Sequence, residues 1–479
     1  MVGRNLNGRG FVRIAPLRGR AGWSIASAMS ASLSRRSVLA GVAASIVSLP
    51  ARGQSGAGLR TLEARPGKAR LSAAGEADIL GFDGAVPGPL LRYKQGDALA
   101  VRLLNKTDQP LTLHWQGMRG DNAMDGVAPL TQPAVASGGQ FDYRRTLTDP
   151  GLFCYRPSVW GTTPELVGRG LKGLLVVDEA TPLSADADVI LALDDWRLDA
   201  KGALEGGFKD AKDVIGDGRV GPALAVNGKA APASFDAAPG ARVRLRLANL
   251  ANARIMLLTI EGARPYTIAI DSQPCDAFEP VRRTIPAAPG ARFELMFDMP
   301  QAETATVKLL LGTVHAGGKD EQTLAVFTAR GAKAAGRPPI ASLPQNPALP
   351  PEIKLAQSKK VDLVIEAHPG ATPSWTINGV KTAAYAGEPL FRVKRGTPVT
   401  LGFVNKSPVA LAMHVHGCAA RLLHDLDDGW EPYWRNAIIV SASKTKHIAF
   451  ITDSPGKWAV HDDILEHEAA GLATWFAVD

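Results

Sequence analysis

The residues best suited to chemistry in this chain are histidines, which bind transition metals through their ring nitrogens. Six of the nine histidines lie after residue 410. His414 and His416 stand in the run HVHG, and alternate residues of a strand face the same side. His114 stands in a similar run, HWQG, and His461 and His467 stand in HDDILEH. Any metal chemistry is therefore expected to concentrate in the segments after residue 410 and in the segment that faces them.

An internal repeat predicts the elements that must position these histidines. Three stretches look alike: KQGDALAVRLLNKT, APGARVRLRLANLA and KRGTPVTLGFVNKS. A glycine and an asparagine are nine residues apart in each copy: Gly96 and Asn105, Gly240 and Asn249, and Gly396 and Asn405. The alternating apolar residues between them are typical of half-buried strands, and the glycines mark the preceding turns. A repeat this long is a whole domain, so we expect three similar β-domains.

The repeat puts two histidines at equivalent positions. His114 and His414 each follow the repeat asparagine by nine residues, whereas the second copy has Leu258 there. Two residues further on, Gln116 of the first domain matches His416 of the third. We therefore expect the metal ligands to come from the first and third domains.

A second pair of segments aligns as well. DPGLFCYRPS in the first domain matches SPGKWAVHDDILEH in the third. In this alignment Arg156 takes the place of His461, and Ser158 takes the place of Asp463. The segment of the first domain therefore lacks histidines where the third domain has one.

Composition and length support an all-β chain of three domains. The chain has 479 residues, with 49 glycines and 34 prolines, which favours turns over long helices. The predicted boundaries are a signal peptide over 1–53, domains over 56–178, 187–331 and 353–479, and a Pro-rich linker over 332–352.

The amino-terminal segment is typical of a twin-arginine export signal. Arg35 and Arg36 precede an apolar run over 38–49, which is too short to span a bilayer, and small residues follow at 51–53. Residues 1–53 contain eight arginines and no acidic residue, so the net charge of +8 disappears when they are removed. We expect a periplasmic protein that meets the Tat translocase during export and has no nucleic-acid partner and no stable membrane anchor. Either Met1 or Met29 could be the true start.

The motifs resemble those of the multicopper oxidase family over essentially the whole mature chain. LTLHWQGMRGDNAMDGVAPLTQPAVASGGQFDY resembles the family's first copper-binding block, MHVHG its third-domain HxxHxHG block, and WAVHDDILEHEAAGLATWF its HCHILxHxxxGM block. The resemblance implies three cupredoxin-like Greek-key β-sandwich domains. It also implies a type 1 copper that takes electrons from substrate and a trinuclear cluster that reduces dioxygen between the first and third domains.

Carried over residue by residue, the type 1 ligands are largely absent. Leu411, Asp462 and Leu472 replace a histidine, the cysteine and the axial methionine, and only His467 remains. A blue-copper site needs the thiolate and a second imidazole. We therefore expect that this site cannot form.

The cluster positions are only half retained. His114 and His414 remain at the type 2 position, and His416 and His461 remain at type 3. The other type 3 histidines are replaced by Gln116, Arg156, Ser158 and Asp463. We expect no copper cofactor, and a residual copper site at these histidines is the alternative.

Two functions follow from this pattern. The first is a non-catalytic exported protein, most like the copper-free SufI/FtsP-type members of the family that support bacterial cell division. A periplasmic protein partner is compatible with this function. The alternative is a copper-binding oxidoreductase that uses a residual site between the first and third domains. Full multicopper oxidase activity is not expected.

Two contacts at that interface can be predicted. Arg156 is expected to pair with Asp463, or with its neighbour Asp462, because a buried charge needs a partner. Strand alternation places Cys154 and Cys418 at the same interface, where they form either a disulfide or two buried free thiols.

Replacement of Arg35 and Arg36 by Lys is expected to trap the protein in the cytoplasm, because the twin-arginine route reads that pair. Cell fractionation and the size of the processed chain measure this. If the variant still reaches the periplasm, unprocessed or through the general secretory route, the chain does not carry a twin-arginine signal.

Overall fold

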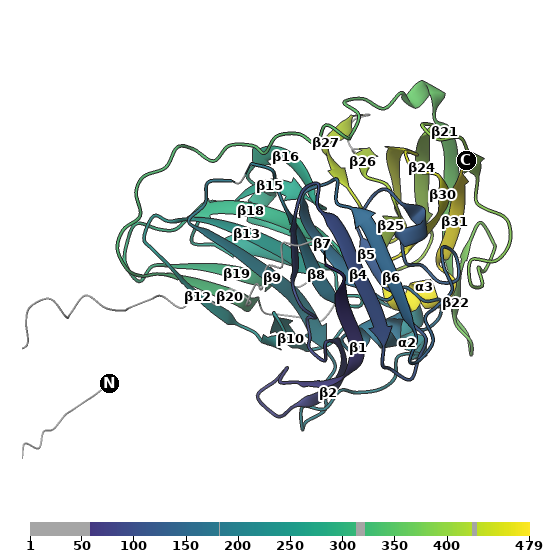
Figure 1. The fold of residues 1–479 in the computed structure, drawn as a ribbon, viewed down its shortest axis with the longest axis horizontal. Coiled ribbons are helices and arrows are strands. Elements are labelled where there is room, and N and C mark those ends of the chain that lie inside the picture. The colour runs from purple at the N-terminus through teal and green to yellow at the C-terminus, as the bar shows by residue number, and fades with distance from the viewer. Residues whose placement is uncertain (1–57, 182, 313–320, 424–428) are drawn as a thin grey trace, which may run out of the picture. The chain divides into compact units, whose positions relative to one another are not determined.

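The computed structural model describes residues 58–181, 183–312, 321–423 and 429–479. The predicted signal segment, His315 and His424 lie outside these residues. Within them the chain is built mostly of β-strands, as Figure 1 shows. The predicted all-β fold class is confirmed. Each pair of sheets described below comes from one continuous stretch of chain, which Figure 1 shows as neighbouring colours.

The first two sheets share one buried core. The first sheet has the order β2 (Ala77–Phe82), β1 (Arg60–Ala69), β4 (Ala98–Asn105) and β6 (Gln140–Thr146). The second has the order β3 (Leu91–Lys94), β8 (Gly173–Asp178), β7 (Gly151–Arg156) and β5 (His114–Gln116). Val101 of β4 and Tyr155 of β7 lie in the same hydrophobic cluster, so the two sheets form a sandwich.

The next two sheets form a second sandwich. One has the order β11 (Lys229–Ala230), β10 (Ala223–Val226), β9 (Ala187–Trp196), β13 (Arg242–Asn249), β18 (Arg292–Asp298), β15 (Tyr266–Ile270) and β16 (Gln273–Phe278). The other has the order β12 (Ala233–Ala237), β20 (Gln322–Ala329), β19 (Thr306–Gly312), β14 (Met256–Glu261) and β17 (Thr284–Ala287). Leu245 of β13 and Leu309 of β19 belong to their common core.

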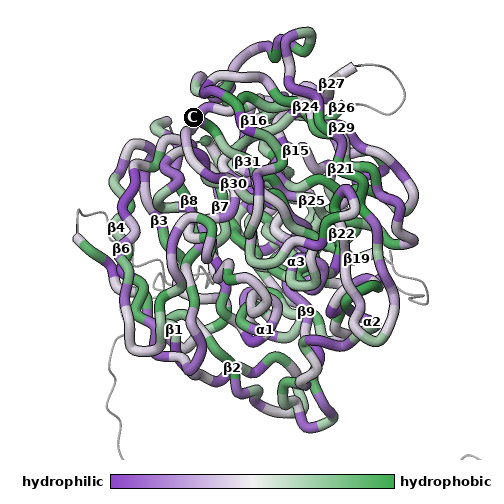
Figure 2. Tube along the Cα trace, turned by 90° about the vertical axis from the view of Figure 1, so that its right-hand side faces the viewer, coloured by the Kyte–Doolittle hydropathy of each residue, from purple (hydrophilic) through white to green (hydrophobic). Residues whose placement is uncertain are grey.

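The last two sheets form the third sandwich. One has the order β22 (Ser374–Ile377), β21 (Lys359–His368), β24 (Pro398–Asn405), β29 (Thr445–Ile451), β26 (Ala420–Leu423) and β27 (Trp430–Arg435). The other has the order β23 (Arg392–Val393), β31 (Ala473–Val478), β30 (Gly456–Asp462), β25 (Leu411–Val415) and β28 (Ala437–Val440). Leu401 of β24 and Val460 of β30 share its core. Figure 2 shows hydrophobic and hydrophilic residues alternating along many strands, as expected where one face of a sheet meets a core.

The sequence repeat corresponds to the same strand in each sandwich. β4, β13 and β24 are eight residues long, and each ends on the repeat asparagine. Each pairs in parallel with the first strand of its sandwich and antiparallel with a later one. The preceding glycines all have positive φ, between 74° and 91°, which glycine adopts at little cost.

The repeat asparagines explain why the histidines stand at a fixed distance from these strands. Each donates its side-chain Nδ2 to backbone carbonyls of the following segments: Asn105 to Gln109 and Val135, Asn249 to Arg254 and Ala287, and Asn405 to Val409, Val440 and Ser441. These bonds fix the start of the segment that leads to the next strand. In the first and third sandwiches that strand is β5 or β25, which carries His114 or His414.

Short helices lie near the third sandwich. They are α1 (Thr163–Gly168), α2 (Ala211–Ile215) and α3 (Leu465–Ala469), and the 3₁₀ turns are Asn122–Met124, Val281–Arg283 and Leu355–Gln357. α3 contacts both α1 and α2, so residues of all three sandwiches meet around it. Among the described residues, none of the helices has the length and apolar character needed to cross a membrane.

Candidate metal centre

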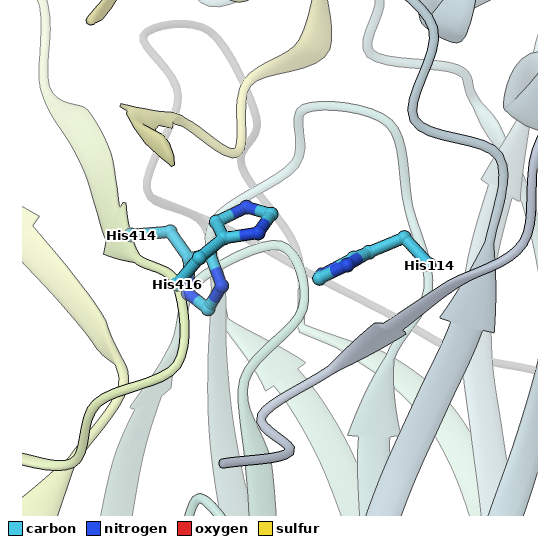
Figure 3. Close-up of side chains that lie close together, drawn as sticks. All are labelled: His114, His414 and His416. Atoms are coloured by element: carbon cyan, nitrogen blue, oxygen red, sulfur yellow. The ribbon is translucent and has the colours of Figure 1, made fainter. Parts of the chain in front are cut away.

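Three buried histidines lie together where the first and third sandwiches meet. His114 comes from β5, and His414 and His416 come from β25 and the residue after it. Their ligand atoms lie within 4.8 Å of one another. Figure 3 shows His114 facing the other two from the opposite side. This is the convergence that the HWQG and HVHG runs predict.

Hydrogen bonds fix the tautomers of His114 and His414. Nδ1 of His114 lies 2.8 Å from the carbonyl oxygen of Asp125, and Nδ1 of His414 lies 2.9 Å from that of Asn436. A carbonyl only accepts, so Nδ1 donates in both rings and Nε2 carries the lone pair. Both Nε2 atoms are buried and have no hydrogen-bond partner. Two unshared lone pairs therefore face the space between the rings, as metal ligands would.

His416 and His461 form a second pair beside them. Nδ1 of His416 lies 2.9 Å from a carboxylate oxygen of Asp125, and Nδ1 of His461 lies 3.0 Å from the carbonyl of Asp462. Their Nε2 atoms are only 2.7 Å apart. If both rings are neutral with Nδ1 protonated, two lone pairs face each other, which a cation or a shared proton between them would relieve.

Burial favours the neutral, metal-binding form of these rings. It lowers the pKa of His414 and His461 well below the usual value, and the neighbouring histidines add to the effect. Burial also lowers the pKa of His416 to about 4, although Asp125 acts in the opposite direction. Metal-bound histidines commonly donate their second nitrogen to a carbonyl or carboxylate, as all four rings do here. The residues fit a copper ion held by imidazole nitrogens.

Three of the residues that replace family ligands bind one another. Arg156 Nη2 donates to Asp463 Oδ1 at 2.8 Å, and Arg156 Nε donates to Gln116 Oε1 at 3.1 Å. Gln116 Nε2 closes the triangle by donating to the second oxygen of Asp463 at 2.6 Å. The predicted pair of Arg156 and Asp463 is confirmed. Burial raises the pKa of Asp463, and the guanidinium opposes that rise.

The position that matches the type 1 site holds a closed hydrogen-bond network. One carboxylate oxygen of Asp462 accepts from the backbone N–H groups of Ala412 and Ile464. The other lies 2.8 Å from His467 Nδ1, and His467 Nε2 lies 2.8 Å from the carbonyl of Gly216. Both ring nitrogens thus lie within hydrogen-bond distance of acceptors, so neither is open to a metal without displacing one of these contacts. His467 does not join the other four histidines.

The remaining replaced positions are packed into the protein. Leu411 and Leu472 belong to the hydrophobic core of the third sandwich. Ser158 is buried in the first sandwich, where its N–H donates to Thr112 Oγ1. None of these three side chains offers a nitrogen or sulfur ligand.

The cysteines are free thiols. Cys154 packs with Ala248 and Leu250 of the second sandwich, whereas Cys418 lies in the core of the third. Cys154 also lines a small pocket with Asp463 and Leu465, so the predicted alternative of two buried free thiols, and not a disulfide, is confirmed. Burial raises the pKa of Cys154 to about 12, so it stays a protonated thiol.

Sequence reasoning missed two buried acids: Asp125 beside the histidines, and Glu468 near Arg156 and Asp463. Asp125 contacts His114 and His416. The sequence signal that could have identified it is the MDGV run, which contains this residue. Burial raises the pKa of Glu468 to about 7, and one of its carboxylate oxygens has no hydrogen-bond partner. Tyr385 lies 3.4 Å from its other oxygen. Neither acid stands at a position that the repeat matches to a ligand, so spacing alone could not identify them.

Comparison with known proteins agrees with this fold and centre. Family models for multicopper oxidases match residues 64–182 and 355–479. The multicopper oxidase MmcO of Mycobacterium tuberculosis is 28% identical, with 95% of each chain covered. The multicopper oxidase mco of Staphylococcus aureus is 24% identical, with 88% of this chain and 89% of that protein covered.

Solved structures extend the similarity to the three-dimensional fold. A multicopper oxidase from Pseudomonas thermotolerans superimposes with a TM-score of 0.78 at 27% identity, covering 88% of this chain and 99% of that one. Lac15 from a marine microbial metagenome gives a TM-score of 0.72 at 29% identity, covering 88% and 100%. The two matched ranges contain the histidine segments described above. The chain belongs to the multicopper oxidase family.

Proposed function

We propose that this protein is an exported, non-catalytic member of the multicopper oxidase family that serves a structural or division-supporting role in the periplasm, as SufI/FtsP-type members do. The observation that carries the proposal is the network of Asp462 and His467. It occupies the position where an oxidase of this family takes electrons from its substrate.

The network argues against a blue-copper centre for two reasons. Such a centre needs a cysteine thiolate, and here a carboxylate stands in its place. The one retained ligand, His467, is hydrogen-bonded through both ring nitrogens. Without this centre, electrons have no copper through which to reach a dioxygen-reducing cluster.

The residues that stand in place of histidines at the cluster position support the same proposal. Arg156 brings a buried positive charge to a place where relatives of this family would hold copper ions, and like charges repel strongly at short range in a protein interior. Its pair with Asp463 joins the first and third sandwiches directly. The two domains can therefore stay together without a metal ion between them.

The second candidate is a copper-binding protein that sequesters the metal or supports a simple redox reaction. It is favoured by the unshared Nε2 lone pairs of His114 and His414. His416 and His461 lie close enough to contribute. A single copper ion at these rings would supply one-electron chemistry, but not four-electron reduction of dioxygen.

The purified protein is expected to lack oxidase activity toward phenols, cuprous ion and ferrous ion, and to lack the blue colour of a type 1 centre. Protein from copper-supplemented cells should be assayed for turnover and visible absorption, with metal counted per chain. Stoichiometric copper together with turnover of any of these substrates contradicts the non-catalytic proposal.

Copper content separates the two candidates. If the second is right, the chain takes up one copper ion, and His414→Ala abolishes uptake because it removes an unshared lone pair. His447→Ala is the matched control, since His447 is half-exposed and does not belong to the histidine group of the centre. Copper bound equally by both variants would place the metal elsewhere.

The pair of Arg156 and Asp463 is expected to link the domains energetically. Arg156→Ala or Asp463→Ala alone should lower the free energy of unfolding by roughly 3–5 kcal/mol, because each strands a buried charge. The double variant should lose much less than the sum of the two, since neither charge remains. Denaturant unfolding of the three variants measures the coupling, and strictly additive losses contradict it.

A further inference from the structure

A cavity separate from the histidine centre lies beside the Pro-rich segment that connects the second and third sandwiches. Its volume is about 240 Å³. Residues 343–347 of that segment form one wall, and residues of the first and second sandwiches form the others. None of the five predicted metal-site histidines lines it. A cavity of about 150 Å³ can already hold a benzene ring, so this one has room for a ring with a short side chain.

Most of the wall is apolar. Pro150, Pro274, Leu343 and Pro347 supply the larger apolar surfaces. Leu343 is itself buried, packed with Ile268 and Met296 of the second sandwich, so this part of the connecting segment is held in place. A ligand in this cavity would bury an apolar body against fixed surfaces.

The polar groups of the wall are mainly hydrogen-bond acceptors. Glu179 and Glu294 contribute carboxylates, which accept only. Three side-chain donors on the wall bond to the protein itself: Gln95 Nε2 to Thr148 O at 2.9 Å, Asn346 Nδ2 to Gln273 Oε1 at 2.9 Å, and Ser272 Oγ to Leu152 O. The wall also includes the neutral side chains of Thr181 and Gln345, so its only charged groups are the two carboxylates. The cavity therefore suits a ligand that donates hydrogen bonds.

The two carboxylates belong to an ion-pair network with an excess of negative charge. It joins three guanidinium groups to four carboxylates: Arg92, Arg244 and Arg246 with Asp178, Glu179, Asp188 and Glu294. Burial raises the pKa of Glu179, but the ion pair with Arg244 has the larger effect, and the pKa is lowered. The network is one positive charge short of neutrality, and a half-buried carboxylate at its edge faces the cavity.

We propose that this cavity binds a small organic cation: a protonated amine on an apolar body about the size of an aromatic ring. The ammonium group would lie against Glu179 and Glu294 and supply the missing positive charge. The apolar body would lie against the prolines and Leu343. A bare metal ion fits less well, because it needs several oxygen ligands around it and most of the wall is apolar. This site is independent of the proposed function.

The probe is 2-phenylethylammonium, titrated into the mature chain by calorimetry and by ligand-observed NMR. The neutral 2-phenylethanol and the anionic 3-phenylpropionate are the matched controls, since they share the ring and differ in charge. Saturable binding of the ammonium compound alone is expected. No saturable binding of the amine at millimolar concentration, or equal binding of the alcohol, overturns the proposal.

Two substitutions locate the site. Glu179→Gln removes the excess charge but leaves Arg244 paired with Glu294, and it should weaken amine binding at least tenfold. Ala180→Trp should abolish binding by filling the cavity from its exposed rim. Ala341→Trp, on an exposed residue of the same connecting segment outside the cavity wall, is the control and should bind normally. If either Glu179→Gln or Ala180→Trp binds as the unaltered chain does while its thermal unfolding is unchanged, the amine does not occupy this cavity.

Discussion

A guanidinium group buried between the first and third sandwiches constrains the residues around it. Taking a charge out of water costs several kcal/mol unless a partner of opposite sign and further hydrogen bonds compensate it. Asp463 supplies the charge, and Gln116 bonds to both partners. Arg156 Nη1 has no partner, but the bonds that the three groups do make with one another help to fix how the two sandwiches meet. A change to any one of them affects the other two.

The same interface contains a second arrangement with the opposite property. The rings of His114 and His414 are held from outside by carbonyl groups, and their inner nitrogens have no partner. One side of the centre is thus bridged by its own ion pair, whereas the other keeps free lone pairs. Buried polar groups without partners are uncommon in proteins and call for an explanation. A bound cation would provide one, and it would enter only the side that carries the imidazoles.

The relation between this chain and its family illustrates how little of a fold decides activity. The overall fold is similar to that of the oxidases, as the superposition on solved relatives indicates. The chemistry of the family depends on a few ligand atoms within that frame, and a fold alone does not assign them a function. At the position of the electron-accepting copper the chain has Asp462, Leu411 and Leu472, two of which simply extend the core. The frame can persist because the cores, and not the metals, hold each sandwich together.

The sequence by itself determined the domain repeat, the strands that end on Asn105, Asn249 and Asn405, and the convergence of three histidines, because these follow from periodicity and local spacing. Together with the family resemblance, which places both residues at the interface of the first and third domains, it also predicted that Arg156 would pair with Asp463 or Asp462, since buried charges need partners of opposite sign. Only the tertiary structure decided that Cys154 packs on the second sandwich and that His467 Nε2 lies against the carbonyl of Gly216. It also decided that Asp125 links His114 to His416. In each case the partner comes from a different sandwich or a loop far along the chain, and nothing in the local spacing encodes which surface a strand will face.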